Sequence, residues 1–177
     1  MTTHPLRESA PVVEKTSWTE VTVKTLILDP RSESPVVFLE SLDETLVLPI
    51  WIGIFEATAI VLALEKHTLP RPMTHDLLAS VIRALGTPLK CVRIHSMRDG
   101  TFFGALEFQR DRNLFHVDSR PSDAIAAAVR LKVPIFVRTD LCESSETIEE
   151  FFRDIRDEQY RQLLEKVDPK AVSKYVM

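Results

Sequence analysis

The feature that most constrains the fold is a strand–helix–strand pattern in the last third of the chain. Residues 114–117 and 134–138 are short β-prone runs, and residues 121–131 between them form an alanine-rich helical run. Two strands joined through one helix pair in parallel with a right-handed crossover. The alanines at 124 and 126–128 would let the helix lie close to the sheet. We therefore expect the strands at 114–117 and 135–138 to run parallel in one sheet.

The other β-prone runs favour antiparallel pairing. Three of them follow one another through short connections before Gly53, as in a meander. Two more flank Asp99-Gly100, which is a strong hairpin signal. The sequence predicts an α+β fold with one mixed, mostly antiparallel sheet, whose strands lie near residues 21–28, 35–39, 45–51, 89–95, 101–108, 114–117 and 135–138.

Two further helices are predicted between these strands. Residues 54–66 are rich in Ala, Leu and Glu and apolar nearly all round, which is typical of a buried helix. Thr74 is a suitable N-cap for a second helix, which Gly86 would end.

The two ends of the chain differ from its centre. Residues 1–17 mix Pro, Ser, Thr and charges, as a flexible tail does. Residues 143–177 form a predicted helical extension, in which 145–167 have the pattern of an amphipathic helix. That helix could pack on its own domain or dock on a partner. The remaining residues, 18–142, are enough for one domain with a sizeable core.

Composition excludes several classes of protein. The net charge of -4 lacks the basic excess of strong non-specific DNA binders. Cys91 and Cys142 support neither a disulfide framework nor a cysteine zinc site. No signal-peptide core or membrane-length apolar run occurs, so we expect a cytoplasmic protein without membrane contact. Glycine-rich nucleotide-binding motifs are also missing, and we expect no organic cofactor.

Polar residues gather where the predicted helices begin. Glu56 lies on an otherwise apolar helix face, where it could complement the helix dipole, bind a metal or act as a general base. Arg71, His75 and Asp76 fall within six residues, a composition that acid–base or phosphate chemistry uses. Capping by Asp76 and simple solvation of His75 are the alternatives.

The third helix start is the segment Asp118-Ser119-Arg120-Pro121-Ser122-Asp123. Free N–H groups at the start of a helix can hold an anion, and an arginine can clamp a phosphate through two hydrogen bonds. Asp118 and Asp123 could share a divalent cation through oxygen ligands. The same segment could also serve only to cap the helix.

These segments resemble the successive signatures of the bifunctional nuclease (BFN) domain family. The resemblance runs in order and with the expected spacing from about Val21 to about Cys142. It implies a compact α+β fold that self-associates and hydrolyses phosphodiester bonds of DNA and RNA. The segments that carry it are residues 49–53 with Glu56-Ala57, 71–77, 100–103, 118–126 and 133–137.

The leading interpretation is a phosphodiesterase acting on nucleic acid, and it assigns a role to each polar residue. The alternative is a non-catalytic oligomeric module that binds nucleic acid, an anionic ligand or a protein. In either case we expect a homo-oligomer, because Trp51 and the Phe151-Phe152 pair add apolar surface beyond one modest core. In the phosphodiesterase, Asp118, Asp123 and Glu56 could bind Mg²⁺ or Mn²⁺, or one of these carboxylates could act as a general base. Arg71, Arg120 and Ser122 would bind phosphate. His75 or Asp76 would transfer protons.

Overall fold

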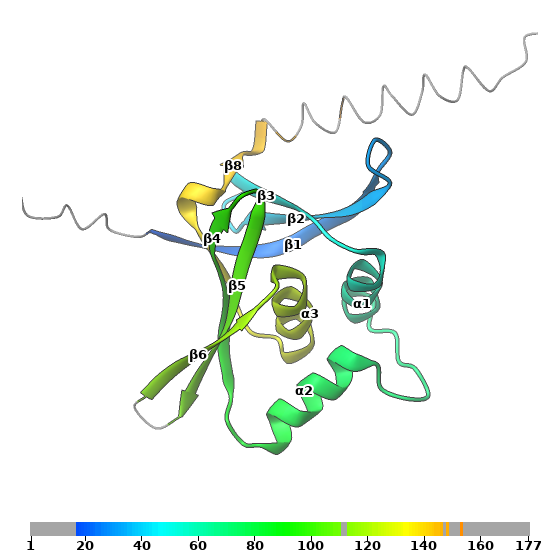
Figure 1. Cartoon of the computed structure of the whole chain (residues 1–177), viewed down its shortest axis with the longest axis vertical. Coiled ribbons are helices and arrows are strands. Elements are labelled where there is room, and N and C mark those ends of the chain that lie inside the picture. The colour runs from blue at the N-terminus through cyan, green and yellow to red at the C-terminus, as the bar shows by residue number, and fades with distance from the viewer. Residues whose placement is uncertain (1–16, 111–112, 147, 149–152, 154–177) are drawn as a thin grey trace, which may run out of the picture.

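The computed structural model of the chain describes residues 17–110, 113–146, 148 and 153 (Figure 1). They build one eight-stranded sheet and three α-helices. The strands are β1 (Trp18–Asp29), β2 (Ser34–Ser41), β3 (Leu46–Trp51), β4 (Leu89–Arg98), β5 (Thr101–Arg110), β6 (Asn113–Ser119), β7 (Ile135–Arg138) and β8 (Glu143–Ser144). The helices are α1 (Ile54–Leu64), α2 (Thr74–Ala84) and α3 (Pro121–Leu131), with a short 3₁₀ turn at Thr139–Leu141.

The sheet is mixed, as predicted. Its strand order is β6-β5-β4-β7-β1-β2-β3-β8, and β4–β7 is the only parallel pair among these neighbours. The meander β1–β2–β3 is confirmed. The hairpin between β4 and β5 is also confirmed, with Asp99 (φ 49°) and Gly100 (φ 74°) both in the left-handed region. Two successive positive φ angles are what a tight two-residue hairpin turn requires.

The parallel unit differs from the prediction in its pairing. Strands β6 and β7 do run in the same direction, because β6 is antiparallel to β5, β5 is antiparallel to β4, and β4 is parallel to β7. However, β7 forms hydrogen bonds with β4 and not with β6. Strands β4 and β6 already occupy both edges of β5. The connection through α3 therefore crosses β5 and β4, and β7 pairs with the free edge of β4.

All three helices lie inside the curve of the sheet, and α3 is the central one (Figure 1). Helix α3 packs on β4 and β5 and also contacts α1 and α2. Its alanine-rich face is buried, with residues 124–128 at most 1% exposed. Small side chains at these positions allow the close approach that the sequence predicted. A smaller apolar cluster lies apart from this core and contains Val36, Phe38, Val47 and Ile148.

Helix α1 is less buried than predicted. Ala57, Ala59 and Ile60 face the core, but Ile54 and Phe55 are exposed. The helix packs on α3 and β2 along one face only, so its other apolar face stays open.

Helix α2 begins one residue earlier than predicted. Its N-cap is Met73, and Thr74 is its first residue. The Asp76 carboxylate accepts the Met73 amide proton at 3.0 Å, which closes this helix start in place of a threonine hydroxyl.

The ends of the chain lie largely outside the described residues. The predicted N-terminal tail is described only at residue 17. Of the predicted helix over 145–167, Ser145, Glu146, Ile148 and Arg153 are helical, and the Phe151-Phe152 pair lies outside the described part. No helix in the described part of the chain is long and apolar enough to cross a membrane.

Candidate functional site

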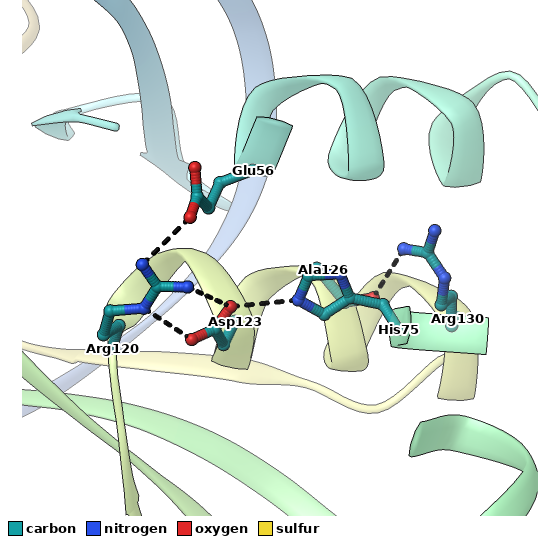
Figure 2. A network of polar contacts seen from close by, with 6 residues as sticks. All are labelled: Glu56, His75, Arg120, Asp123, Ala126 and Arg130. Atoms are coloured by element: carbon teal, nitrogen blue, oxygen red, sulfur yellow. Dashed lines mark hydrogen bonds and ion pairs between the residues drawn. The ribbon is translucent and has the colours of Figure 1, made fainter. Parts of the chain in front are cut away.

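The starts of all three helices meet at one place (Figure 2). Glu56 stands in the first turn of α1, His75 in the first turn of α2, and Asp123 in the first turn of α3, where Arg120 is the N-cap. They meet because α3 packs against both α1 and α2. The four side chains form a continuous chain of polar contacts, which we call the helix-start cluster.

Arg120 joins two carboxylates from different helices. Its Nε and Nη2 atoms donate to Asp123 Oδ2 and Oδ1 at 2.7 and 3.0 Å, and its Nη1 lies 2.9 Å from Glu56 Oε1. The hydrogen bonds with Asp123 raise the pKa of Arg120 further above its ordinary value, and Glu56 adds to this effect. The arginine side chain is nonetheless 65% exposed, so its guanidinium remains accessible from solvent.

His75 contacts the other side of the same aspartate. Its Nε2 lies 3.0 Å from Asp123 Oδ1, and its side chain is 14% exposed. Burial raises the pKa of Asp123, but the hydrogen bonds from Arg120 and His75 outweigh burial and hold that pKa below its usual value. Asp123 is therefore ionised at neutral pH and can only accept a hydrogen bond. A neutral His75 donates to this carboxylate from Nε2, and in that tautomer Nδ1 can accept a proton.

Two cavities open on either side of Arg120. The larger holds about 540 Å³ and is lined on its polar side by Glu56, His75, Asp118, Ser119, Arg120 and Asp123. Its apolar lining comes from Phe55, Ala59, Met73, Leu78 and Leu106. The smaller holds about 330 Å³ and shares only Glu56 and Arg120 with the larger. An accessible arginine and a histidine–aspartate pair beside open space can bind an anion and move a proton.

Sequence comparison identifies the family of the chain. The bifunctional nuclease domain model matches residues 37–150. An uncharacterized protein of Mycobacterium tuberculosis is 38% identical over 159 residues, which cover 85% of this chain and 95% of that protein. The chain belongs to the bifunctional nuclease domain family.

Plant members of the family are more distant. Bifunctional nuclease 1 of Oryza sativa subsp. indica is 30% identical over 95 residues, which cover 52% of this chain and 29% of the rice protein. Bifunctional nuclease 1 of Arabidopsis thaliana is 29% identical over 114 residues, which cover 62% of this chain and 35% of the plant protein. The matches span only about a third of the length of these plant relatives.

In this bifunctional nuclease domain, Asp76 lies outside the helix-start cluster. Its Oδ1 accepts from Arg130 Nε at 2.6 Å while its Oδ2 caps α2. The hydrogen bond from Arg130 and the backbone bond from Met73 lower the pKa of Asp76. The Arg130 side chain is 8% exposed and comes from α3, so its contact with Asp76 ties α2 to α3, and it also donates to Ala126 O within α3. The structure thus gives Asp76 a structural contact, although it adjoins His75.

The other predicted site residues take no part in the contacts of the helix-start cluster. Asp118 borders the larger cavity, but its carboxylate forms no hydrogen bond or ion pair with any residue of the described part of the chain. Ser122 is buried in the first turn of α3 and borders the smaller cavity. Arg71 lies exposed between α1 and α2, and it takes part in none of the ion pairs found in the described part of the chain. Within the described ranges, no three His, Cys, Asp or Glu side chains are arranged to hold a metal.

Three features in or beside the site were missed. Arg130 is 54 residues from Asp76, and nothing in the sequence links the two. Ser119, in the wall of the larger cavity, has a buried Oγ that finds no hydrogen-bond partner among the described residues. Phe55 is 83% exposed beside that cavity. Of the three, only Phe55 had a sequence signal, which is an aromatic residue next to Glu56 at a predicted helix start.

Proposed function

We propose that the helix-start cluster hydrolyses phosphodiester bonds of DNA and RNA. The contact between His75 and Asp123, with Asp123 also held by Arg120, carries this proposal. It combines a proton acceptor, its orienting carboxylate and an accessible cation at the wall of one cavity. Membership of the bifunctional nuclease domain family supports it, as do the names of the plant relatives.

Arg120 would bind the phosphate that reacts. A guanidinium has five N–H donors, and the contacts with Asp123 and Glu56 use three of them. One N–H on each terminal nitrogen therefore remains for phosphate oxygens. Glu56 and Asp123 would hold the guanidinium in one orientation, which lowers the entropy that binding costs.

His75 would act as the general base. Its Nδ1 would take a proton from water while the water oxygen bonds to phosphorus and the ester P–O bond breaks. Asp123 would keep the imidazole oriented and stabilise its charged form. The imidazolium would then return the proton to the leaving alkoxide. Proton transfer of this kind contributes about 10²- to 10⁴-fold to rate.

A divalent cation is a further part of the proposal. Glu56 and Asp123 place carboxylate oxygens around a single guanidinium, so both already converge on one positive charge. Mg²⁺ and Mn²⁺ prefer such oxygen ligands, and Asp118 borders the same cavity. Glu56, Asp118 and Asp123 are not arranged to hold a metal as they stand in the described part of the chain, so their side chains would have to turn towards a cation. Held by them, the cation would neutralise phosphate charge and acidify water.

A nuclease assay on DNA and on RNA tests the proposal. We expect purified protein to cleave both, and Asp123→Asn protein prepared in the same way to be at least about 100-fold slower. Asparagine has the shape of aspartate and keeps one oxygen that can accept a hydrogen bond from Arg120 or His75, so the fold should survive. Equal cleavage by both proteins would mean that the activity belongs to a contaminant or another site. Parallel reactions with Mg²⁺, Mn²⁺ or EDTA decide whether a cation takes part.

The alternative is a non-catalytic oligomeric binding module. Arg120 already has two carboxylate partners, an arrangement that also serves to tie helices together. A well-folded protein that binds nucleic acid or another anionic ligand but never cleaves DNA or RNA would favour this function. The cytoplasmic location expected from the sequence stays a prediction under either function.

Self-association is proposed for both functions. β6 is an edge strand, and its Leu114, Phe115 and Val117 are 50%, 40% and 49% exposed. Exposed apolar edge strands readily pair with another chain. Light scattering should return a multiple of the 20.2 kDa chain mass, and a monomer at micromolar concentration would contradict the prediction.

A further inference from the structure

The larger cavity combines an exposed aromatic ring with an anion-binding corner. Phe55 lies next to Glu56 in the first turn of α1 and is 83% exposed, the most exposed large apolar side chain in the described part of the chain. Ala59, one helical turn further on, is buried and lines the same cavity. A small residue below an aromatic one leaves open space against the ring. Exposed apolar surface at the edge of a cavity is typical of a ligand site.

The opposite wall of this cavity is polar. His75, Arg120 and Asp123 line it, and Ser119 adds a buried hydroxyl oxygen. Ser119 Oγ has no hydrogen-bond partner within the described ranges, although buried polar groups are nearly always paired. If the Ser119 side chain turned towards the cavity, a ligand with polar edges could supply the missing partner. The cavity therefore suits a molecule that has a flat apolar face, polar edges and a nearby negative charge.

We propose that this cavity binds an unpaired nucleobase, which stacks on Phe55 while the adjoining phosphate lies on Arg120. The substrate class is then single-stranded DNA or RNA. This inference rests on the proposed function, because it takes the phosphate site from there. The volume of about 540 Å³ falls within the usual range for small-ligand pockets of about 300–1,000 Å³.

Base pairing decides between single and double strands at such a site. In a duplex the bases are stacked inside, and one reaches an aromatic side chain only after it is unpaired and extruded. Every base has a π-face, so stacking on Phe55 tolerates all sequences. Stacking and phosphate contacts also ignore the sugar 2′-hydroxyl. A site of this kind would accept both DNA and RNA, provided that the strand is single.

Binding of a cleavage-resistant oligonucleotide tests the inference. The probe is a fluorescein-labelled phosphorothioate single strand, compared with the same strand in a duplex, at one fixed salt concentration in EDTA. We expect the whole chain to bind the single strand more tightly than the duplex. Phe55→Ala should weaken single-strand binding about 5- to 100-fold, whereas Phe55→Trp should retain it.

Leu85→Ala is the matched control. Leu85 is 74% exposed and follows the last residue of α2, at the other end of that helix from His75. The Leu85→Ala substitution removes exposed apolar surface outside the cavity, so single-strand binding should stay unchanged. Light scattering of Phe55→Ala protein tests whether Phe55 contacts a second copy of the chain instead of a base. In that case the substitution would change the number of subunits. That result would overturn the inference.

The inference and the proposed hydrolysis can fail separately. Binding that depends on Phe55 in a protein that never cleaves would remove the hydrolysis and keep the base site. If the protein cleaves but wild type and Phe55→Ala bind the single strand with equal affinity, the base site is removed and the hydrolysis is kept. Equal affinity for duplex and single strand would also overturn the base site.

Discussion

Two regions of this domain contain an arginine, a carboxylate and a histidine in close contact. One is the helix-start cluster of Glu56, His75, Arg120 and Asp123. The other, which we call the sheet cluster, consists of Lys90, Arg93, Glu107 and His116 on strands β4, β5 and β6. In the sheet cluster Glu107 Oε2 accepts from Arg93 Nε at 2.8 Å and lies 3.8 Å from His116 Nδ1. Lys90 Nζ is 3.9 Å from Glu107 Oε1.

The two clusters differ in what surrounds the charges. Glu107 is 3% exposed, and Arg93 stacks on Trp18 and Phe136 at 4.5 and 5.6 Å from the ring centroids. Burial raises the pKa of Glu107, but the hydrogen bond and charge of Arg93 outweigh it and keep that pKa below its usual value. In the helix-start cluster, by contrast, the guanidinium of Arg120 is largely exposed between two cavities. The same residue types thus stabilise the fold in one place and remain accessible in the other.

Substitution of the histidine of each cluster should give the largest difference in nuclease activity. His75→Ala should lower nuclease activity about 10²- to 10⁴-fold, because it removes the proposed general base. His116→Ala is the matched control in the sheet cluster, and its activity should stay near that of wild type. Rates on a single-stranded substrate check both. Similar losses in the two variants would mean that the clusters do not differ in function.

Glu107→Gln should have the largest effect on stability. It removes the counter-charge of Arg93, and breaking a buried ion pair costs about 3–5 kcal/mol. Arg93 is 27% exposed, so we expect a value near the low end, about 3 kcal/mol. Chemical denaturation measures the change. A loss below about 1 kcal/mol would indicate that this pair is dispensable, as surface pairs are.

Ala126→Leu tests the helix that carries half of the helix-start cluster. Ala126 is fully buried on α3, and overpacking a close-packed core costs about 1–3 kcal/mol. We expect a lower midpoint of thermal unfolding, with activity reduced because Arg120 and Asp123 move with α3. Substitution of Thr22, which is exposed on β1, is the control and should be nearly silent. An unchanged midpoint for Ala126→Leu would contradict the packing.

Asp76→Asn should have a smaller effect, about 1–2 kcal/mol, since it weakens the hydrogen bond with Arg130. The pKa of Asp76 is lower in the folded state, so its contribution is present above the unfolded value of about 4 and is lost as pH falls through the folded value. Wild type should therefore lose more stability than Asp76→Asn between pH 5 and pH 2. Parallel acid unfolding curves for the two would contradict this role. Activity per folded molecule should change little.

Local chemistry explains which parts of the site were predictable. The helix starts at 71–76 and 118–123 could be identified because proline, arginine and acidic residues act on the nearest turns. Helix α3 was predicted with the bounds that it has, since its alanine pattern is contained in one segment.

Long-range packing explains the rest. The contact of Arg130 with Asp76 and that of Arg93 with Glu107 join residues on different elements, and no sequence pattern announces them. The same holds for the pairing of β7 with β4, because the sequence does not say which strand edge is free. The polar residues of the three helix starts were expected to serve one site, but the contacts they make there depend on how α3 packs against α1 and α2.

The most direct test replaces the arginine of each cluster with glutamine and measures activity and unfolding midpoint on the same preparations. We expect Arg120→Gln to lose at least about 100-fold in activity, as removal of one group that stabilises developing charge does, and to keep its midpoint. Arg93→Gln should lower the midpoint clearly and keep its activity at temperatures where it is folded. Full activity in Arg120→Gln, or a midpoint that falls as far as that of Arg93→Gln, would contradict the assignment of function to the helix-start cluster.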